Sequence, residues 1–480
     1  MTSRATTLGE LKQSGWRSLP VKDEVRRNAV ARVAAGLPLV DGVLGFDETV
    51  LPQMENAVLA GHDIILLGER GQAKTRIIRG LSNLLDEWMP VIAGSEINDD
   101  PFGPVSSYAR ALVAEQGDDT RIEWVHRDNR FGEKLATPDT SIADLIGEVD
   151  PIKVAEGRYL SDELTLHYGL VPRSNRGIFA VNELPDLAER IQVGLLNVLE
   201  ERDIQIRGHK VRLPLDVLLV ASANPEDYTN RGRIITPLKD RFGAQVRTHY
   251  PLDVDTELVI VRQEARVQTT TTGNGDLRVQ VPDHMAAIVA TITHEARRSP
   301  QVNQRSGVSV RLSIANYETM VANATRRALR LGEREAVPRV SDLESLASST
   351  AGKVEIEAFE EGRSESVVDR LVKASVLAVF RERCPIERLG AVVGDFEGGV
   401  VAQVGDGVPS AVYVDLLGRV PSLRQAVSPL VTGESPAELA SAVELVLEGL
   451  HLSRRLNKDT LAGAVGSGGR AGPRAAYRGR

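Results

Sequence analysis

The sequence has little cysteine and no long apolar run, and both absences narrow the class of protein. Cys384 is the single cysteine among 480 residues, so an internal disulfide is excluded and a reducing cytoplasm is expected. No apolar run approaches the ~20 residues that a membrane-spanning helix needs, and the first residues lead into polar sequence without the apolar core of a signal peptide. No group of cysteines and histidines has metal-ligand spacing. The sequence therefore predicts a cytoplasmic protein without a membrane span.

Basic residues are outnumbered by acidic ones, which bears on the partners of the protein. The chain has 58 Lys and Arg against 66 Asp and Glu, a formal net charge of -8. A chain of this balance, without a recognisable DNA-binding module, is not expected to bind nucleic acid. Hydrophobic residues make up 42% and charged residues 26% of the chain, a composition that suits a packed core with a solvated surface. The length leaves room for about three domains.

The clearest motif is a glycine-rich loop between an apolar run and a predicted helix. Ile64–Leu67 is the apolar run, and Lys74-Thr75 opens the helix. Against the pattern G-x-x-x-x-G-K-[ST] only the second glycine differs, because Ala73 takes its place. In such a loop the backbone N–H groups surround a phosphate chain, the lysine reaches the outer phosphates and the hydroxyl holds Mg²⁺. An ordinary strand–turn–helix is the alternative. The predicted nucleotide site comprises Gly68, Glu69, Arg70, Gly71, Gln72, Ala73, Lys74 and Thr75.

Two further apolar runs also end in polar residues. Gly177–Asn182 is followed by Glu183, and Val217–Ala223 is followed by Asn224. In an ATPase a carboxylate at the first position polarises the attacking water, and the residue before it helps to hold the metal shell. An asparagine at the second strand end can orient that water. Three strands that each deliver polar groups at their carboxyl ends describe the ligand edge of an open parallel sheet.

With these motifs the chain resembles AAA+ ATPases of the clade that holds the MoxR proteins and the magnesium-chelatase motor subunit. The Gly71–Thr75 form of the loop resembles the MoxR form, while Asp144–Asp150 and Tyr168–Pro172 are similar to the chelatase motor. The resemblance covers roughly residues 37–350. It implies an α/β fold, an AAA+ P-loop parallel sheet with helices on both faces, followed by a helical lid and a C-terminal extension. It also implies ATP and Mg²⁺ as cofactors, with Lys74 and Thr75 as their ligands.

The same resemblance implies roles for further residues and for partners. Glu183 falls at the catalytic base, Asn224 at the first sensor, Arg241 at the arginine finger and Arg311 at the second sensor. Members of this clade form rings, so a hexamer of the chain itself is expected. They work beside a protein with a von Willebrand factor A domain, so a partner of that kind is expected as well. The implied activity is ATP-driven remodelling of a client protein, or insertion of a metal into a cofactor protein.

One position departs from the family pattern. The family has Asp-Glu where this chain has Asn182-Glu183. Aspartate adds a negative charge to the water shell of the metal, whereas asparagine offers a neutral oxygen. A close unit charge pair is worth about 4 kcal/mol near a protein surface, and a water-bridged contact is worth less. We therefore expect Mg-ATP to bind and turnover to be slow. A nucleotide-gated scaffold with little or no hydrolysis is the alternative.

Composition and periodicity divide the chain into five predicted regions. Residues 1–36 read as a helical lead-in, 37–255 as the nucleotide-binding domain and 256–350 as the helical lid. Residues 351–453 read as a mostly helical extension. The last region, 454–480, is rich in Arg and Gly and is expected to be disordered.

Overall fold

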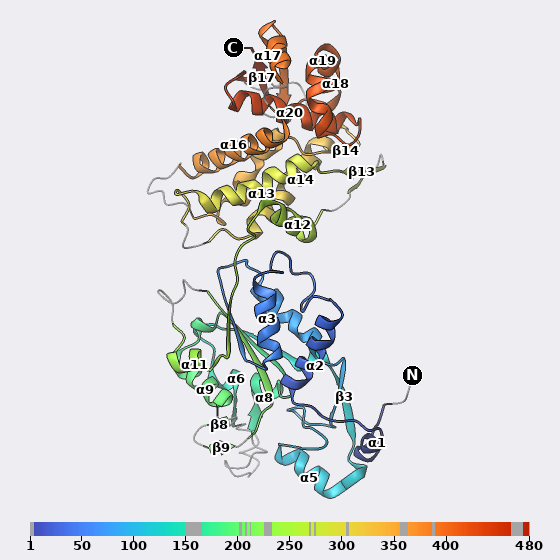
Figure 1. Cartoon of the computed structure of the whole chain (residues 1–480), viewed down its shortest axis with the longest axis vertical. Helices are drawn as coiled ribbons and strands as arrows, with labels where there is room; N and C mark the ends of the chain where they lie inside the picture. The colour runs from blue at the N-terminus through green and yellow to red at the C-terminus, as the bar shows by residue number, and fades with distance from the viewer. Residues whose placement is uncertain are drawn as a thin grey trace. The chain divides into compact units, whose positions relative to one another are not determined.

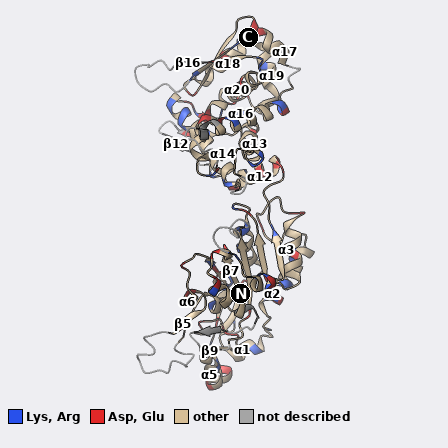
Figure 2. Ribbon diagram, turned by 90° about the vertical axis from the view of Figure 1, so that its left-hand side faces the viewer, with Lys and Arg blue, Asp and Glu red and all other residues tan. Residues whose placement is uncertain are grey.

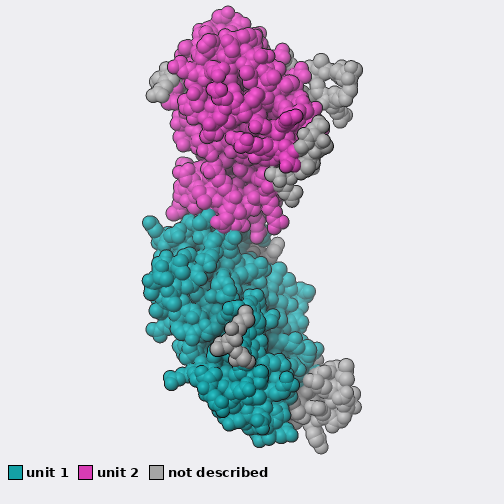
Figure 3. Space-filling view, turned by 90° about the vertical axis from the view of Figure 1, so that its right-hand side faces the viewer, with its two compact units in different colours: residues 1–249 teal, residues 250–480 magenta. Residues whose placement is uncertain are grey.

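In the computed structural model the chain forms two compact units, Met1–His249 and Tyr250–Arg480, which Figure 3 colours separately. The structure describes residues 4–149, 166–200, 204–206, 209–211, 213–224, 233–267, 270–272, 275–303, 307–355, 363–385, 389–461 and 474–479. Within these ranges no helix is both long and apolar enough to span a membrane.

The first unit is built on a five-stranded sheet with the strand order β11-β1-β10-β7-β4. All four neighbouring pairs run parallel. The central strands are runs of apolar residues without charge, as expected for strands that are covered on both faces. In Figure 2 their ribbon accordingly has the colour of uncharged residues. The strands are β1 (Ile64–Leu67), β4 (Phe131–Leu135), β7 (Gly177–Asn182), β10 (Val217–Ala223) and β11 (Ala244–Arg247).

Helices cover both faces of this sheet (Figure 1). Alternate side chains of each strand enter different cores, because successive residues of a strand point to opposite faces: Ile65 belongs to one buried cluster and Ile64 to the other. One face packs against α2 (Val21–Ala34), α3 (Val50–Leu59) and α4 (Lys74–Gly80). The other packs against α8 (Leu170–Arg173), α9 (Glu189–Glu200) and α11 (Thr236–Arg241). The predicted α/β class, a parallel sheet with helices on both faces, is confirmed.

Shorter elements complete the first unit. The pairs β2–β3, β5–β6 and β8–β9 are antiparallel. Helix α2, within the predicted lead-in, packs into the unit, since Val21, Val25 and Ala29 are buried in its core. The remaining elements are α1 (Leu8–Gln13), β2 (Trp88–Ile92), α5 (Ser107–Gln116), β3 (Ile122–His126), α6 (Ile142–Leu145), β5 (Gly147–Val149), β6 (Leu166–Tyr168), β8 (Ile204–Ile206) and β9 (His209–Val211).

The second unit is mostly helical and has one large buried core that runs in sequence from Leu258 to Tyr477. The predicted lid, 256–350, and the predicted extension, 351–453, thus share a core instead of packing separately. The unit begins at Tyr250, close to the predicted boundary at 255. Its helices are α12 (Val254–Glu264), α13 (Asp283–Arg298), α14 (Arg311–Leu331), α15 (Leu346–Thr350), α16 (Arg363–Arg383), α17 (Gly390–Glu397), α18 (Ser410–Arg419), α19 (Pro421–Val427) and α20 (Pro436–Leu452). Its strands include β12 (Thr270–Thr272), β13 (Gly275–Val279) and β14 (Glu335–Ala336).

The predicted disordered tail is wrong for the residues of it that form strands. Strand β17 (Arg474–Arg478) pairs antiparallel with both β15 (Val401–Gly405) and β16 (Asn457–Leu461) and is the middle strand of their sheet. Tyr477 is 2% exposed, and its hydroxyl donates a hydrogen bond to Glu448. Hydrogen bonds on both sides of β17 and the burial of one aromatic ring offset the entropy that favours disorder in a Gly- and Arg-rich segment.

His284, in the first turn of α13, is a buried titratable group of the second unit. It is 1% exposed, and its Nε2 lies 2.9 Å from Ser441 Oγ. The Ser441 hydroxyl donates its proton to the Pro338 carbonyl oxygen at 2.6 Å, so Nε2 must be the protonated donor. Burial, aided by the charge of Arg383, lowers the pKa of His284 to about 4. The imidazole is therefore neutral in the folded unit.

We expect the stability of the second unit to fall on acidification because of His284. The unfolded imidazole titrates near 6.5 and the folded one near 4, so the contribution is complete above pH 6.5 and is lost as the pH falls towards 4. Between about pH 8 and about pH 5 the loss amounts to roughly 2 kcal/mol of unfolding free energy. Urea unfolding followed by circular dichroism should show this difference between the parent and His284→Gln. Equal pH dependence in both proteins would contradict the assignment.

Candidate functional site at the carboxyl edge of the sheet

Parallel pairing brings the ends of four strands to one edge of the first unit. Leu67 of β1 pairs with Ala223 of β10, and Asn182 of β7 pairs with Leu135 of β4. The Gly68 N–H extends the first pairing, since it donates to the Ala223 carbonyl oxygen at 3.1 Å. The structure thus brings the glycine-rich loop, Asn182, Glu183 and Asn224 together at one edge, as predicted.

The glycine-rich loop runs from Gly68 to Ala73 and ends where α4 begins. Gly71 and Ala73 have φ angles of 77° and 55°. The left-handed conformation of Ala73 costs about 1–2 kcal/mol for a residue with a Cβ atom. Ala73 therefore takes the backbone conformation for which glycine is suited, and it keeps the shape of the loop at an energetic cost. Thr75, on the first turn of α4, is exposed.

Lys74 folds back over the loop. Its Nζ donates hydrogen bonds to the carbonyl oxygens of Gly68 and Glu69, the latter at 2.8 Å, and the residue is 6% exposed. An ammonium held by two carbonyl dipoles lies against the loop backbone, where an anion would be attracted to it. A phosphate that binds there offers full charge in place of those dipoles.

Gln72 fixes the loop from inside. Its Oε1 accepts hydrogen bonds from the Glu69 N–H at 3.0 Å and from the Thr248 hydroxyl at 2.8 Å. A Cβ atom at Gly68 would overlap both the Thr248 hydroxyl and Gln72 Oε1. Only glycine therefore fits at the start of the loop while these hydrogen bonds are in place. Arg70 is exposed at the loop surface.

The end of β7 carries a hydrogen-bonded chain across three strands. Asn182 is 7% exposed; its Nδ2 donates to Glu133 Oε1 at 2.5 Å, and its Oδ1 accepts from the Ser222 hydroxyl at 3.2 Å. Ser222 also accepts from the Glu183 N–H at 3.2 Å. Glu183 has a φ angle of 55°. This conformation turns the chain sharply directly after the strand and presents Glu183 at the sheet edge.

Glu133 is a site residue that the sequence motifs did not indicate. It lies on β4, next to β7, and its second carboxylate oxygen accepts from Arg79 Nε of α4 at 2.8 Å. That hydrogen bond and the charge of the carboxylate raise the pKa of the Arg79 guanidinium. The sequence shows an acidic residue within Phe131–Leu135, but its role in the site follows only from the pairing of this strand with β7.

Asn224, Arg241 and Arg311 are the remaining predicted site residues. Asn224 follows β10 and is 2% exposed, and its Oδ1 accepts no hydrogen bond within the described part of the chain. Arg241 is the exposed last residue of α11. Arg311 is the first residue of α14 in the second unit. Its part in the nucleotide site stays a prediction.

The residues at the edge fit a magnesium nucleotide. Mg²⁺ prefers oxygen ligands and a few carboxylates beside the phosphates, and Thr75, Glu133 and Asn182 offer such oxygens. The loop is a cradle that a Cβ atom at Gly68 would fill, and Lys74 is buried against it. The buried Asn224 Oδ1 adds an acceptor for a water molecule at the end of β10.

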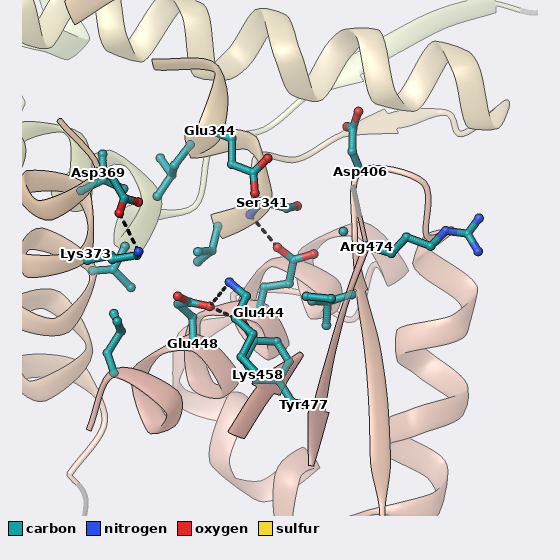
Figure 4. A pocket seen from close by; sticks show the side chains of 18 of the residues that line it. Ser341, Glu344, Asp369, Lys373, Asp406, Glu444, Glu448, Lys458, Arg474 and Tyr477 are labelled. Atoms are coloured by element: carbon teal, nitrogen blue, oxygen red, sulfur yellow. Dashed lines mark hydrogen bonds and ion pairs between the residues drawn. The ribbon is translucent and has the colours of Figure 1, made fainter. Parts of the chain in front are cut away.

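The second unit contains a cavity of about 340 Å³ between α16, α20 and the sheet of β15–β17 (Figure 4). Its buried carboxylates serve packing. Glu444 accepts from the Ser341 N–H at 2.8 Å and from the Tyr413 hydroxyl. Glu448 accepts from Lys458 Nζ at 2.7 Å and from Tyr477. These bonds attach the strands and the segment before α15 to α20.

Comparison with known protein families finds a match within the first unit. The profile of the Sigma-54 interaction domain family matches residues 156–241, a segment that includes β7, Glu183 and Asn224. No protein with a curated description matches the chain.

Matches among solved structures include magnesium chelatase, in a complex of its subunits BchI and BchD. That chain is 19% identical, with coverage of 68% of this chain and 99% of the other and a TM-score of 0.34. A candidate ATPase from Cytophaga hutchinsonii is 16% identical, with 76% and 98% coverage and a TM-score of 0.30. NtrX from Brucella abortus in complex with ATP is 15% identical, with 82% and 72% coverage and a TM-score of 0.38.

We expect a substitution at Gly68, the first residue of the glycine-rich loop, to destabilise the first unit, and one at Ala73, the last residue, to leave its stability nearly unchanged. Gly68→Ala should lower the unfolding free energy of the first unit by about 1–3 kcal/mol, because the new Cβ atom displaces Thr248 or Gln72. Ala73→Gly should stay within about 1 kcal/mol of the parent, since relief of the left-handed alanine offsets the greater freedom of the unfolded glycine. All three tryptophans, Trp16, Trp88 and Trp124, lie in this unit, so urea unfolding by fluorescence measures it directly. An unchanged unfolding free energy in Gly68→Ala would contradict this expectation, because it would mean that Thr248 or Gln72 moves aside at little cost.

Proposed function

We propose that the chain is an ATP-binding and ATP-hydrolysing AAA+ motor of the MoxR or magnesium-chelatase type. The observation that carries this proposal is the meeting of the glycine-rich loop, with Lys74 folded over it, and the polar ends of β7 and β10 at one sheet edge. In this proposal the loop N–H groups and Lys74 bind the phosphates, and Thr75 and Asn182 face Mg²⁺. When bound, the metal neutralises phosphate charge.

The chain's own residues supply the rest of the proposed reaction. Glu183, directly after β7, would take the proton of the attacking water, and Asn224 would orient that water through its buried Oδ1. The hydrogen bond from the Ser222 hydroxyl to Asn182 and the one from the Glu183 N–H to Ser222 hold these two residues in a fixed relation. Arg311 is proposed as a further nucleotide contact from the second unit.

A nucleotide-gated scaffold is the second candidate, and Asn182 favours it. The amide has no charge, and it already donates to Glu133 and accepts from Ser222. If that arrangement persists with nucleotide bound, ATP would bind and turnover would be slow. Steady-state phosphate release by the purified protein separates the two candidates.

We expect Lys74→Ala to abolish ATP binding and Glu183→Gln to keep it. Lys74 supplies the ammonium at the predicted phosphate position, whereas Glu183 acts in the chemical step alone. Loss of a general base typically costs about 10²–10⁴ in rate. Binding of a fluorescent ATP analogue and phosphate release, measured on the same samples, test both parts. Hydrolysis by Glu183→Gln at the parent rate would contradict the assigned mechanism.

For the assembly we propose a cytoplasmic ring, a hexamer by resemblance, in which Arg241 reaches the site of the neighbouring subunit. Support comes from its exposure at the end of α11. Strand β11 begins three residues later, and its Ala244 pairs with Ile64 at the amino end of β1, so Arg241 is close in sequence to the edge of the sheet opposite the candidate site. A guanidinium supplied in trans stabilises charge that develops on the γ-phosphate.

We further propose a partner with a von Willebrand factor A domain. In this proposal ATP strengthens the binding of the partner, and the partner must then strengthen the binding of ATP to the same degree. The client stays open.

The shared site predicts complementation between two inactive proteins. Arg241→Ala should bind ATP and fail to hydrolyse it, with a loss of about 10³–10⁵ as for other arginine fingers. Mixing it with Lys74→Ala should partly restore phosphate release, because Lys74→Ala subunits offer an intact arginine to intact loops. A control mixture of Lys74→Ala with the double variant Lys74→Ala/Arg241→Ala should stay inactive. No recovery across a range of ratios would argue against a site shared between subunits.

A further inference from the structure

The carboxylate of Glu133 lies between the end of β7 and helix α4. One oxygen accepts from Asn182 Nδ2 at 2.5 Å and the other from Arg79 Nε at 2.8 Å. The side chain is 20% exposed, so it is partly shielded while remaining open to solvent. A single carboxylate thus joins the residue expected to face the metal to the helix that follows the glycine-rich loop.

Helix geometry relates Glu133 to Thr75 as well. Thr75 and Arg79 are four residues apart on α4 (Lys74–Gly80), so their side chains lie on one side of the helix. Since Arg79 pairs with Glu133, the carboxylate lies on the side of α4 that carries the Thr75 hydroxyl. Two of the oxygen groups suited to Mg²⁺, those of Thr75 and Glu133, therefore lie on the same side of α4.

The orientation of the Asn182 amide shows why the charge is not at position 182. Oδ1 accepts from Ser222, so Nδ2 must be the group that points to Glu133, and an aspartate could not donate there. Two carboxylates at this spacing would repel each other, and one would take up a proton. Asparagine on β7 and glutamate on β4 are thus complementary, with one negative charge shared by the pair.

We propose that Glu133 supplies, from the neighbouring strand, the negative charge to the Mg²⁺ shell that an aspartate at position 182 would supply. The inference rests on the proposed nucleotide site and specifies its metal-binding side. Asn182 orients the Glu133 carboxylate through its amide, and Arg79 holds the other oxygen from α4. Because Mg²⁺ in nucleotide sites is held by one or two carboxylates together with the phosphates, a single carboxylate on β4 is sufficient.

The test is the Mg²⁺ dependence of nucleotide binding by the full-length chain. A fluorescent ATP analogue is titrated first with EDTA and then over a series of Mg²⁺ concentrations, with thermal unfolding measured on every variant. Glu133→Gln should raise the Mg²⁺ concentration for half-maximal binding by about tenfold, while binding in EDTA stays within about twofold. The double variant Glu133→Gln/Asn182→Asp moves the charge from β4 to β7, and it should return the midpoint to within about threefold of the parent.

Controls separate a metal role from a packing role. Glu123→Gln removes an exposed carboxylate on β3 and should change neither the midpoint nor the binding in EDTA. An unchanged midpoint in Glu133→Gln would overturn the inference. So would equal weakening with and without Mg²⁺, or a double variant that recovers nothing although it unfolds at the parent temperature. Failure of the parent chain to bind nucleotide at all would overturn the proposed function itself.

Discussion

The position of β7 between β10 and β4 is the constraint on which the candidate site depends. Both of its partners run parallel to it, and their registers place Ala221 and Leu135 beside Val181 and Asn182. Ser222 and Glu133 consequently reach the same asparagine from opposite sides. A shift of either register by one residue would turn these side chains to the other face of the sheet. The polar chain at the edge therefore depends on backbone pairing as much as on the residues that form it.

Local pattern was enough to predict the elements whose signals lie within a few residues. The run Ile64–Leu67 followed by a glycine-rich loop and Lys74-Thr75 predicted a strand, a phosphate-type loop and a helix, and the structure has β1, the loop and α4 at those places. The uncharged runs that end at Asn182 and Ala223 likewise became β7 and β10. In each case hydrophobic periodicity, glycine and chain direction act over short distances, so the sequence carries the signal.

Features that depend on distant pairing could not be predicted in this way. Glu133 is separated from Asn182 by a long stretch of chain, and its role follows only from the parallel pairing of β4 with β7. Strand β17 is similar: the composition around Arg474–Arg478 favours disorder, yet pairing on both sides and the burial of Tyr477 stabilise it. The shared core of residues 258–477 also depends on packing between distant helices, which periodicity along one helix does not specify.

The hydrogen bond between Gln72 and Thr248 joins the glycine-rich loop to the segment through which the chain leaves the first unit. Thr248 also donates its N–H to the Leu67 carbonyl oxygen at 2.9 Å, and His249 Nε2 lies 2.7 Å from Thr49 Oγ1. The unit ends at His249. This segment is therefore held against the loop at Thr248 and against the residue before α3 at His249. A change in the position of Gln72 would therefore alter a contact of Thr248, one residue before the unit ends, without any change in the strands between them.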